Sequence, residues 1–368
     1  MTISKSVFNV DKTDYTGVKS LFLGQTPGLF DSINKTHPDI WKLYKGMKAL
    51  DWDENEFPFV DCASEFKSCS RSVYEMMIKT LAWQWEADSL AAHNLVPVVA
   101  PYVSSSELWA LYSAIGANEV LHALAYSEIV RNTFENPAEV MQEILEEAEA
   151  LRRMETVAGV MSEVKAIGLQ LQTGELSRDD PKARDAIMLF VYTMLGLERI
   201  QFMASFAITF AIAESGMFLP IGQAVKKICT DELSIHVEAS KAVILNELQT
   251  PEGLASFDRI RSRVQKVYKE IVEAELSWGR YMFSEGRELV GMNAELIMNW
   301  VLFNAADVYH FTKLDNPFPF IKKNPIMFIN DWIDMNNHQA SPQEEKTSNY
   351  LLGGLVNDTS DKVYSVDF

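Results

Sequence analysis

The sequence of 368 residues has few cysteines and a shortage of basic residues. Its three cysteines, Cys62, Cys69 and Cys229, form no C-x-x-C pair and no zinc-like spacing, which favours a reducing compartment over a secreted disulfide framework. Lys and Arg number 33 against 51 Asp and Glu, and the net charge of −18 argues against a nucleic-acid-binding surface. We therefore expect no nucleic-acid partner.

Segments that would direct the chain to a membrane are also missing. The first residues, MTISKSVFNVDKTDYTG, lack the basic and apolar regions of a signal peptide. The longest apolar run, from Phe202 to Ala213, has 12 residues and ends at Glu214, which is too short to span a bilayer. The sequence predicts a cytoplasmic protein that does not bind membranes.

The residues that are present follow helical patterns, with no persistent strand alternation. Hydrophobic residues make up 48% of the chain and charged residues 23%, as in a globular protein with a large core. We predict an all-α fold with a helical domain over residues 37–335, an N-terminal arm over 1–36 and a C-terminal tail over 336–368. Long helices are expected over 71–95, 137–172, 183–213, 252–285 and 293–312.

One expected helix carries Glu119, His122 and Tyr126. Their spacing of i, i+3 and i+7 puts all three side chains on one face. The flanking sequence AIGANEVLHALAYSEIV is mostly apolar, so the carboxylate is expected to be buried and to need a cation. A Glu-x-x-His pair of this kind is the half-site signature of di-iron and di-manganese carboxylate bundles.

The rest of the chain supplies a matching half. Asp88 lies on the helix before Glu119, Glu198 lies on a later apolar helix, and Glu232-x-x-x-His236 follows on the next one. A carboxylate followed by a carboxylate–histidine pair, twice over, predicts a dinuclear metal site with bridging carboxylates. The alternative is that buried Arg or Lys residues pair with Asp88 and Glu198, although the neighbouring Arg199 points about 100° away.

Residues 137–172 contain a run of charges. Glu149 and Arg153 are spaced i, i+4, which is typical of an ion pair on a helix surface. We interpret this run as a solvated helix face without a function.

Taken together, these motifs resemble the small, radical-generating subunit of class I ribonucleotide reductases, of the tyrosyl-radical type. The resemblance implies a ferritin-like helical bundle with extra helices and a dinuclear metal site in its core. It implies two metal ions, iron with manganese as the other possibility, and dioxygen as oxidant. The implied ligands are Asp88, Glu119, His122, Glu198, Glu232 and His236.

The resemblance also assigns the radical. Tyr126 lies at the family's radical tyrosine position. Phe202 and Phe206 follow Glu198 at i+4 and i+8, and with Ile228 they match the apolar pocket that shields the radical.

Further residues match the family's radical-transfer chain and tail. Trp52 lies at the position of the transfer tryptophan, and Asp231 at that of the aspartate that binds it. In the segment PQEEKTSNYLLGG, Glu344 and Tyr350 match the tail's glutamate and redox tyrosine. The last residues, DTSDKVYSVDF, resemble the peptide that docks onto the large catalytic subunit.

One spacing departs from the family pattern. The second histidine usually follows its glutamate by three residues, whereas His236 follows Glu232 by four. An i+4 pair still shares a helix face, and a π-bulge would be another way to absorb the extra residue.

The implied activity is that of a ribonucleoside-diphosphate reductase small subunit, a homodimer that acts only with its large subunit. The metal pair and dioxygen generate a radical at Tyr126, and the large subunit uses it to reduce ribonucleotides to deoxyribonucleotides for DNA replication. Two alternatives stay open: a ferritin-like oxidase or monooxygenase acting on a bound organic substrate, and a metal-storage or structural bundle.

Overall fold

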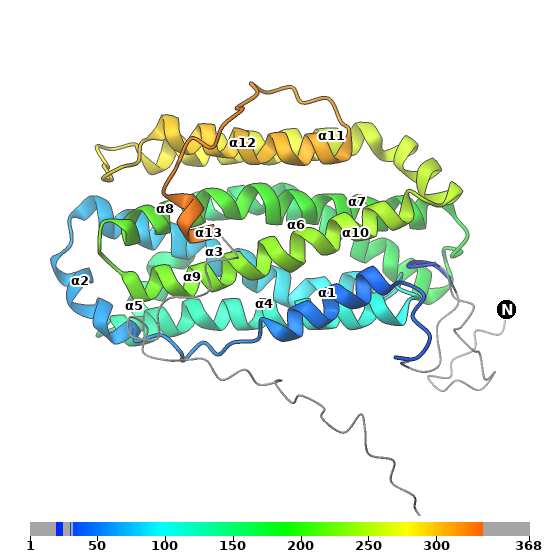
Figure 1. Ribbon diagram of the computed structural model, residues 1–368, viewed down its shortest axis with the longest axis horizontal. Helices are drawn as coiled ribbons and strands as arrows, with labels where there is room; N and C mark the ends of the chain where they lie inside the picture. The colour runs from blue at the N-terminus through cyan, green and yellow to red at the C-terminus, as the bar shows by residue number, and fades with distance from the viewer. Residues whose placement is uncertain (1–19, 25–29, 31, 334–368) are drawn as a thin grey trace, which may run out of the picture.

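The computed structural model describes residues 20–24, 30 and 32–333, and this part of the chain is an all-α bundle, as predicted. The described residues include no strand, and only two isolated β-bridges, Phe22–Val103 and Leu289–Met292. The long helices run roughly along the long axis of the molecule (Figure 1). The helices are α1 Pro38–Ala49, α2 Ala63–Ser68, α3 Arg71–Val99, α4 Ser106–Thr133, α5 Pro137–Leu145, α6 Ala148–Thr173, α7 Pro181–Gly196, α8 Phe202–Glu214, α9 Leu219–Asp231, α10 Val237–Glu247, α11 Pro251–Met282, α12 Ala294–Thr312 and α13 Ile329–Ile333.

Three short helical segments complete the order of elements. The 3₁₀-helix η2 spans Phe59–Cys62, and the π-helices η3 and η4 span Leu197–Gln201 and Glu232–His236. Each π-helix continues directly from one α-helix into the next, so α7–η3–α8 and α9–η4–α10 are two long helices with a π turn in the middle. Together with α3 and α4 they form the core of the bundle, and α6, α11, α12 and α1 pack around it.

The helices α3 and α4 begin at serine caps. The side chain of Ser70 accepts the backbone N–H of Val73 at 3.3 Å, and that of Ser105 accepts the N–H of Leu108 at 3.2 Å. Each cap satisfies one of the N–H groups that the first turn leaves without an intrahelical partner. The two helices then pack closely, because a Cβ at Gly116 of α4 would lie 2.7 Å from a methyl group of Val96 on α3.

The longest apolar helix lies inside the bundle. Residues Pro181–Glu214 form one helix of 34 residues that is long and apolar enough to cross a membrane, but 94% of its most apolar window is buried. The 12-residue run Phe202–Ala213 is therefore the second part of this 34-residue helix. Its burial by neighbouring helices is that of a core helix.

Three expectations about the helices need correction. The segment 137–172 is two helices, α5 and α6, rather than one. The helix expected over 71–95 continues past Pro97 to Val99, although this proline lacks the N–H for one helical hydrogen bond. Arg153 is not on a solvated face: it is buried, at 3% exposure, and pairs with Glu275, while Glu149 pairs with Arg152.

Candidate metal centre

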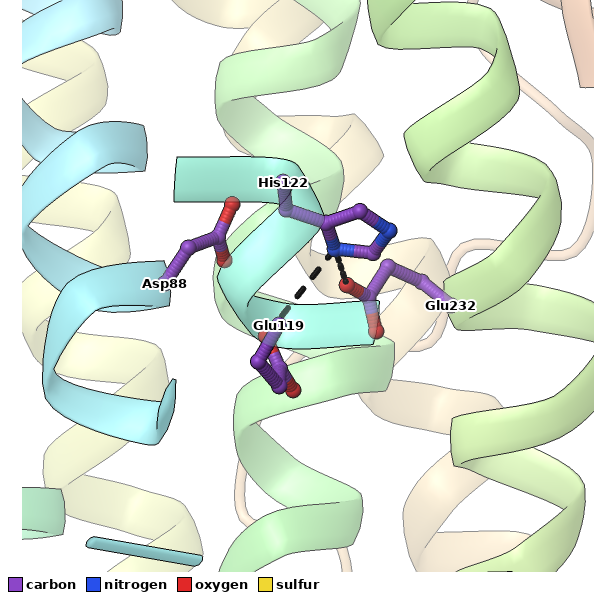
Figure 2. Close-up of side chains that lie close together, drawn as sticks. All are labelled: Asp88, Glu119, His122 and Glu232. Atoms are coloured by element: carbon purple, nitrogen blue, oxygen red, sulfur yellow. Dashed lines mark ion pairs between the residues drawn. The ribbon is translucent and has the colours of Figure 1, made fainter. Parts of the chain in front are cut away.

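The first half of the predicted site comes from α3 and α4. Asp88 projects from the middle of α3 toward α4, where Glu119 and His122 lie one turn apart on the same face (Figure 2). All three side chains are completely buried. Glu119 and His122 therefore share one face of α4, as their i, i+3 spacing predicts.

The second half comes from the two π turns. Glu198 lies in η3, and Glu232 and His236 are the first and last residues of η4. The backbone N–H of Val237 bonds to the carbonyl of Glu232, an i→i+5 bond that defines the π turn. This turn accommodates the four-residue spacing between Glu232 and His236, so the π-bulge considered from the sequence is present.

The six residues meet at one point between the four core helices. Two sets of ligand atoms lie within 4.8 Å of one another, and Glu119 and Glu232 belong to both sets. Two carboxylates shared between two sets is the arrangement of a dinuclear site with bridging glutamates. The first set is Asp88, Glu119, His122 and Glu232, and the second is Glu119, Glu198, Glu232 and His236.

The histidines face the shared glutamates through their Nδ1 atoms. The Nδ1 atom of His122 lies 3.1 Å from Glu232, and that of His236 lies 2.6 Å from Glu232 and 3.3 Å from Glu119. Both imidazoles thus point the same nitrogen into the site and keep Nε2 for outer hydrogen bonds.

These inward-facing atoms fit metal ions. Both oxygens of Asp88, Glu119 and Glu232 and the Nδ1 atoms of both histidines are buried without a well-formed hydrogen bond among the described residues. No Lys or Arg in the described chain forms a salt bridge with Asp88 or Glu198, and Arg199 pairs instead with Asp307 at 3.1 Å. Because buried carboxylates need a counter-charge, this set of oxygen and nitrogen donors could hold a dinuclear metal site.

The electrostatics of the cluster agree with this reading. Burial, then the neighbouring carboxylates, raises the pKa of Asp88 and of Glu198 well above the usual range. Burial alone would also raise the pKa of Glu232, but the adjacent imidazoles of His236 and His122 outweigh it and lower that pKa. Burial would lower the pKa of His122, but Asp231 and Glu232 outweigh it and raise that pKa. Without metal, the raised pKa of His122 favours its protonated, positively charged form beside Glu232.

Outer hydrogen bonds hold the side chains of the cluster in place. One oxygen of Asp231 accepts from Trp52 Nε1 at 2.8 Å and from Asn118 Nδ2 at 3.0 Å, and lies 3.1 Å from His122 Nε2. The Trp52 ring also stacks on His122, with ring centroids 6.1 Å apart. The predicted contact between Trp52 and Asp231 is therefore present, and His122 lies between this pair and the cluster.

Asn118 is the residue that the sequence analysis missed. Its Oδ1 atom lies 3.0 Å from Nε2 of His236, while its Nδ2 atom donates to Asp231. Asn118 thus connects both histidines to a single carboxylate. Its position directly before Glu119 was the only signal in the sequence, and an asparagine in a helix interior has no spacing rule that identifies such a bridge.

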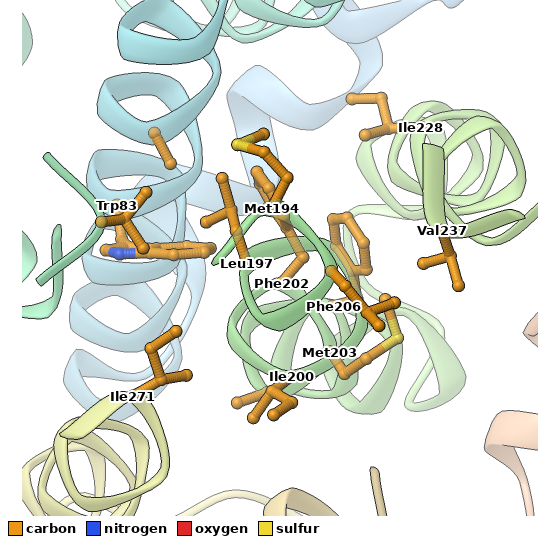
Figure 3. Close-up of a cluster of buried hydrophobic side chains, with 14 of the residues drawn as sticks. Trp83, Met194, Leu197, Ile200, Phe202, Met203, Phe206, Ile228, Val237 and Ile271 are labelled. Carbon is orange, nitrogen blue, oxygen red and sulfur yellow. The ribbon is translucent and has the colours of Figure 1, made fainter. Parts of the chain in front are cut away.

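Tyr126 lies one turn beyond His122 on α4 and is completely buried. Burial, and then the charge of Asp88, raises the pKa of Tyr126 well above that of an exposed phenol. Phe202, Phe206 and Ile228 are buried in one hydrophobic cluster on α8 and α9 (Figure 3). The Phe202 and Phe206 rings are stacked with centroids 5.5 Å apart.

Two predicted residues, Glu344 and Tyr350, lie outside the described residues, as do residues 1–19, 25–29 and 31 of the predicted arm over 1–36 and the whole predicted tail over 336–368. The remaining predicted site residues are all buried.

Comparison with known proteins identifies the family. The model of the family "Ribonucleotide reductase, small chain" matches residues 30–325, which is most of the chain. The chain belongs to this family. This confirms the prediction that the chain is a ribonucleoside-diphosphate reductase small subunit, and hence part of an oxidoreductase.

Individual members of the ribonucleotide reductase small-chain family are similar over their whole length. The ribonucleoside-diphosphate reductase subunit beta of Haemophilus influenzae is 23% identical, over 97% of this chain and 98% of the relative. A subunit beta from Escherichia coli O157:H7 is also 23% identical, over 91% of this chain and 92% of the relative.

Solved structures of this family share the fold. The ribonucleotide reductase R2 subunit from Clostridium botulinum superposes with a TM-score of 0.74 at 19% identity, over 90% of this chain and 98% of that one. The dimanganese(II)-NrdF of Streptococcus sanguinis gives a TM-score of 0.64 at 15% identity, over 83% of this chain and 99% of that one. At these identities the similarity supports the fold alone.

Proposed function

We propose that this small subunit generates a tyrosyl radical at Tyr126 and relays its oxidising equivalent to the large subunit of a ribonucleoside-diphosphate reductase. The observation that carries the proposal is the unbroken chain of contacts from Trp52 through Asp231 and His122 to the carboxylate cluster. A storage protein or a structural bundle would not need that chain.

The six clustered residues would hold two metal ions, for which we propose iron, with manganese as the other possibility. Glu119 and Glu232, which belong to both groups of residues, would help to hold both ions, and each histidine would help to hold one of them. With dioxygen as oxidant, the metal pair would supply the capacity to remove one electron from Tyr126. Iron and manganese accept the same oxygen and nitrogen ligands, so the residues favour neither.

Tyr126 is suited to hold the radical because water does not reach it. Its side chain is completely buried, and we propose that Phe202, Phe206 and Ile228 exclude reductants from its surroundings. Burial also disfavours the phenolate, which keeps the reduced side chain as a neutral phenol.

The proposed relay ends near the surface. Trp52 is 6% exposed and, with Asn118, lines a cleft of about 870 Å³ between α1 and α4. We propose that an electron from the large subunit enters through Tyr350 and reaches the site by way of Trp52. We also propose that Glu344 is the functional glutamate of the tail and that the last residues form the docking peptide.

A homodimer in the cytoplasm is also part of the proposal, and exposed apolar residues of α4 support the dimer. Val120 and Leu124 of α4 are each 45% exposed, and both line the cleft together with Trp109 and Leu121. Apolar side chains clustered on one helix face are typical of a surface that a second subunit covers.

Electron paramagnetic resonance tests the radical directly. After addition of ferrous iron and air, or of manganese with a suitable oxidant, the protein is expected to give a tyrosyl doublet that Tyr126→Phe abolishes. Tyr192→Phe, at another buried tyrosine, is the control and should keep the signal. If no metal produces a tyrosyl signal, the radical proposal is wrong. Metal-dependent oxidation of an added organic substrate would then favour the oxidase alternative.

The tail has a separate test. Deletion of residues 349–368 should leave the radical signal unchanged and abolish turnover with the large subunit. Unchanged turnover would refute the docking role.

A further inference from the structure

Arg153 of α6 is a buried cation beside the proposed radical pocket. Its Nε and Nη2 atoms donate to Glu275 of α11 at 2.8 and 2.6 Å. Its Nη1 atom donates to the Ser205 hydroxyl at 3.1 Å, and Nη2 also donates to the Gln201 carbonyl at 3.2 Å. These last two residues lie on the helix that carries Glu198, so the guanidinium is held firmly at this place.

Two tryptophans enclose this guanidinium. Its central carbon lies 3.8 Å from the ring centroid of Trp83 on α3 and 4.0 Å from that of Trp278 on α11. Glu275 accepts hydrogen bonds at the Nε–Nη2 edge of the guanidinium, whereas the two indole rings lie over its central carbon. Trp83 therefore experiences a fixed positive charge on its face.

Trp83 is close to the site where the electron is removed. It precedes Asp88 by five residues, or about 7.5 Å along the axis of α3. Its ring lies edge-on to Phe202, with centroids 4.9 Å apart, and both belong to the cluster that contains Phe206 and Ile228 (Figure 3). Indole side chains are oxidised about as readily as phenols, so Trp83 is a competitor to Tyr126 as electron donor.

The surroundings of Trp83 differ from those of Trp52. The Trp52 Nε1–H donates to the Asp231 carboxylate, which can stabilise a positive charge on the ring and accept its proton. The Trp83 Nε1–H has no hydrogen-bond acceptor among the described residues, and the ring faces a cation instead. The surroundings of Trp52 therefore favour its oxidation, whereas those of Trp83 oppose it.

We propose that Arg153 is a positioning residue that keeps Trp83 reduced, so that the single electron taken by the oxidised metal pair comes from Tyr126. Loss of one electron from Trp83 would leave an indole radical cation, because its Nε1 proton has no acceptor, and the guanidinium would repel that cation. Loss of one electron from Tyr126 would instead give a neutral radical, with the phenolic proton going to the neighbouring Asp88 carboxylate. This inference rests on the proposed function.

The test removes both charges of the buried pair together. In Arg153→Gln/Glu275→Gln, loaded with iron and exposed to air, we expect part of the tyrosyl signal to be lost and a tryptophan radical signal to appear. Protein grown on ring-deuterated tryptophan should narrow that new signal. Adding Trp83→Phe to the double variant should restore the tyrosyl signal and remove the tryptophan one.

Two further variants separate this role from a purely structural one. Arg287→Gln/Glu75→Gln removes the 3.2 Å ion pair between the buried Arg287 and the partly buried Glu75, and should leave the tyrosyl signal intact. Trp83→Phe alone should also leave the tyrosyl signal intact. If the double variant does not fold, this single variant provides the test: loss of the tyrosyl signal would show that Trp83 takes part in forming the radical and would overturn the inference. An unchanged spectrum in a folded double variant would overturn it too. If the unaltered protein gives no tyrosyl signal, it is the proposed function that fails.

Discussion

The indole Nε1–H of Trp52 donates a hydrogen bond of 2.8 Å to the carboxylate of Asp231, although 179 residues separate the two in the sequence. The same carboxylate oxygen also serves Asn118 and His122. Four side chains from three parts of the chain are thus joined at one oxygen between the surface cleft and the candidate metal site.

The first prediction concerns this connection. Trp52→Phe keeps an aromatic ring but removes the N–H, so metal loading and the Tyr126 signal should persist while turnover with the large subunit is lost. Trp300→Phe is the matched control, because its buried Nε1–H donates to the Met203 carbonyl at 2.8 Å, away from the site. Turnover by the Trp52 variant at the control's rate would contradict a role in transfer.

The second prediction concerns Asn118. Asn118→Leu has a similar volume but frees His236 Nε2 and removes one hydrogen bond to Asp231, so metal affinity should fall by roughly 10–100-fold, as for other lost partners of metal-binding histidines. Competition with a chelator of known affinity measures the change. Asn132→Leu places the same substitution at an exposed position on the same helix and should bind metal normally. Equal affinities in the two variants would show that the bridge does not support the site.

The third prediction is that metal loading releases protons. In the metal-free protein the pKa of Asp88 is raised by burial, and that of His236 is raised to about 10 because Glu232 and Glu119 outweigh the opposite effect of burial. His236 therefore holds a proton at neutral pH, the raised pKa of Asp88 favours its protonated form, and metal ions need the unprotonated forms of both. Affinity should therefore rise from pH 6 to pH 8.

Titration calorimetry checks this at one pH in two buffers of different ionisation enthalpy. The apparent binding heat should differ between the buffers by the heat of the released protons. The exposed-residue variant His93→Gln should release as many protons as the unaltered protein. A heat that does not depend on the buffer would mean that the metal-free site carries no displaceable protons.

The fourth prediction concerns the buried pair Arg153–Glu275. Arg153→Met leaves the Glu275 carboxylate buried without a partner and should destabilise the protein by about 3–5 kcal/mol, whereas Arg153→Met/Glu275→Leu should be less destabilising than the single change. Arg152→Met removes an exposed pair with Glu149 and should cost about 1 kcal/mol or less. Thermal unfolding of the metal-free proteins gives the order, and a double variant less stable than the single one would contradict this account.

Much of the candidate site could be predicted from the sequence because helical periodicity is local. The spacing of Glu119, His122 and Tyr126 fixes them on one face of α4 whatever surrounds that helix. The order of Asp88, Glu198, Glu232 and His236 then matched a known ligand pattern. Residues that follow such a regular spacing can be predicted with little knowledge of the tertiary structure.

Other features depended on which helix faces meet, and a sequence does not state this. The pair Glu149–Arg153 satisfies the i, i+4 rule, yet Arg153 points into the core, because Trp83, Trp278 and Glu275 provide a partner there. Asn118 bridges His236 and Asp231 only because α4 packs against the helix that contains η4.

The sequence by itself therefore determined the all-α class, the six clustered side chains and the buried tyrosine beside them. Only the tertiary structure decided that Glu119 and Glu232 belong to both halves of the site, that a π turn absorbs the extra residue before His236, and that Arg153 is buried. The physical reason is that helical spacing acts within a few residues, whereas burial and hydrogen-bond partners are set by contacts between segments far apart in the chain.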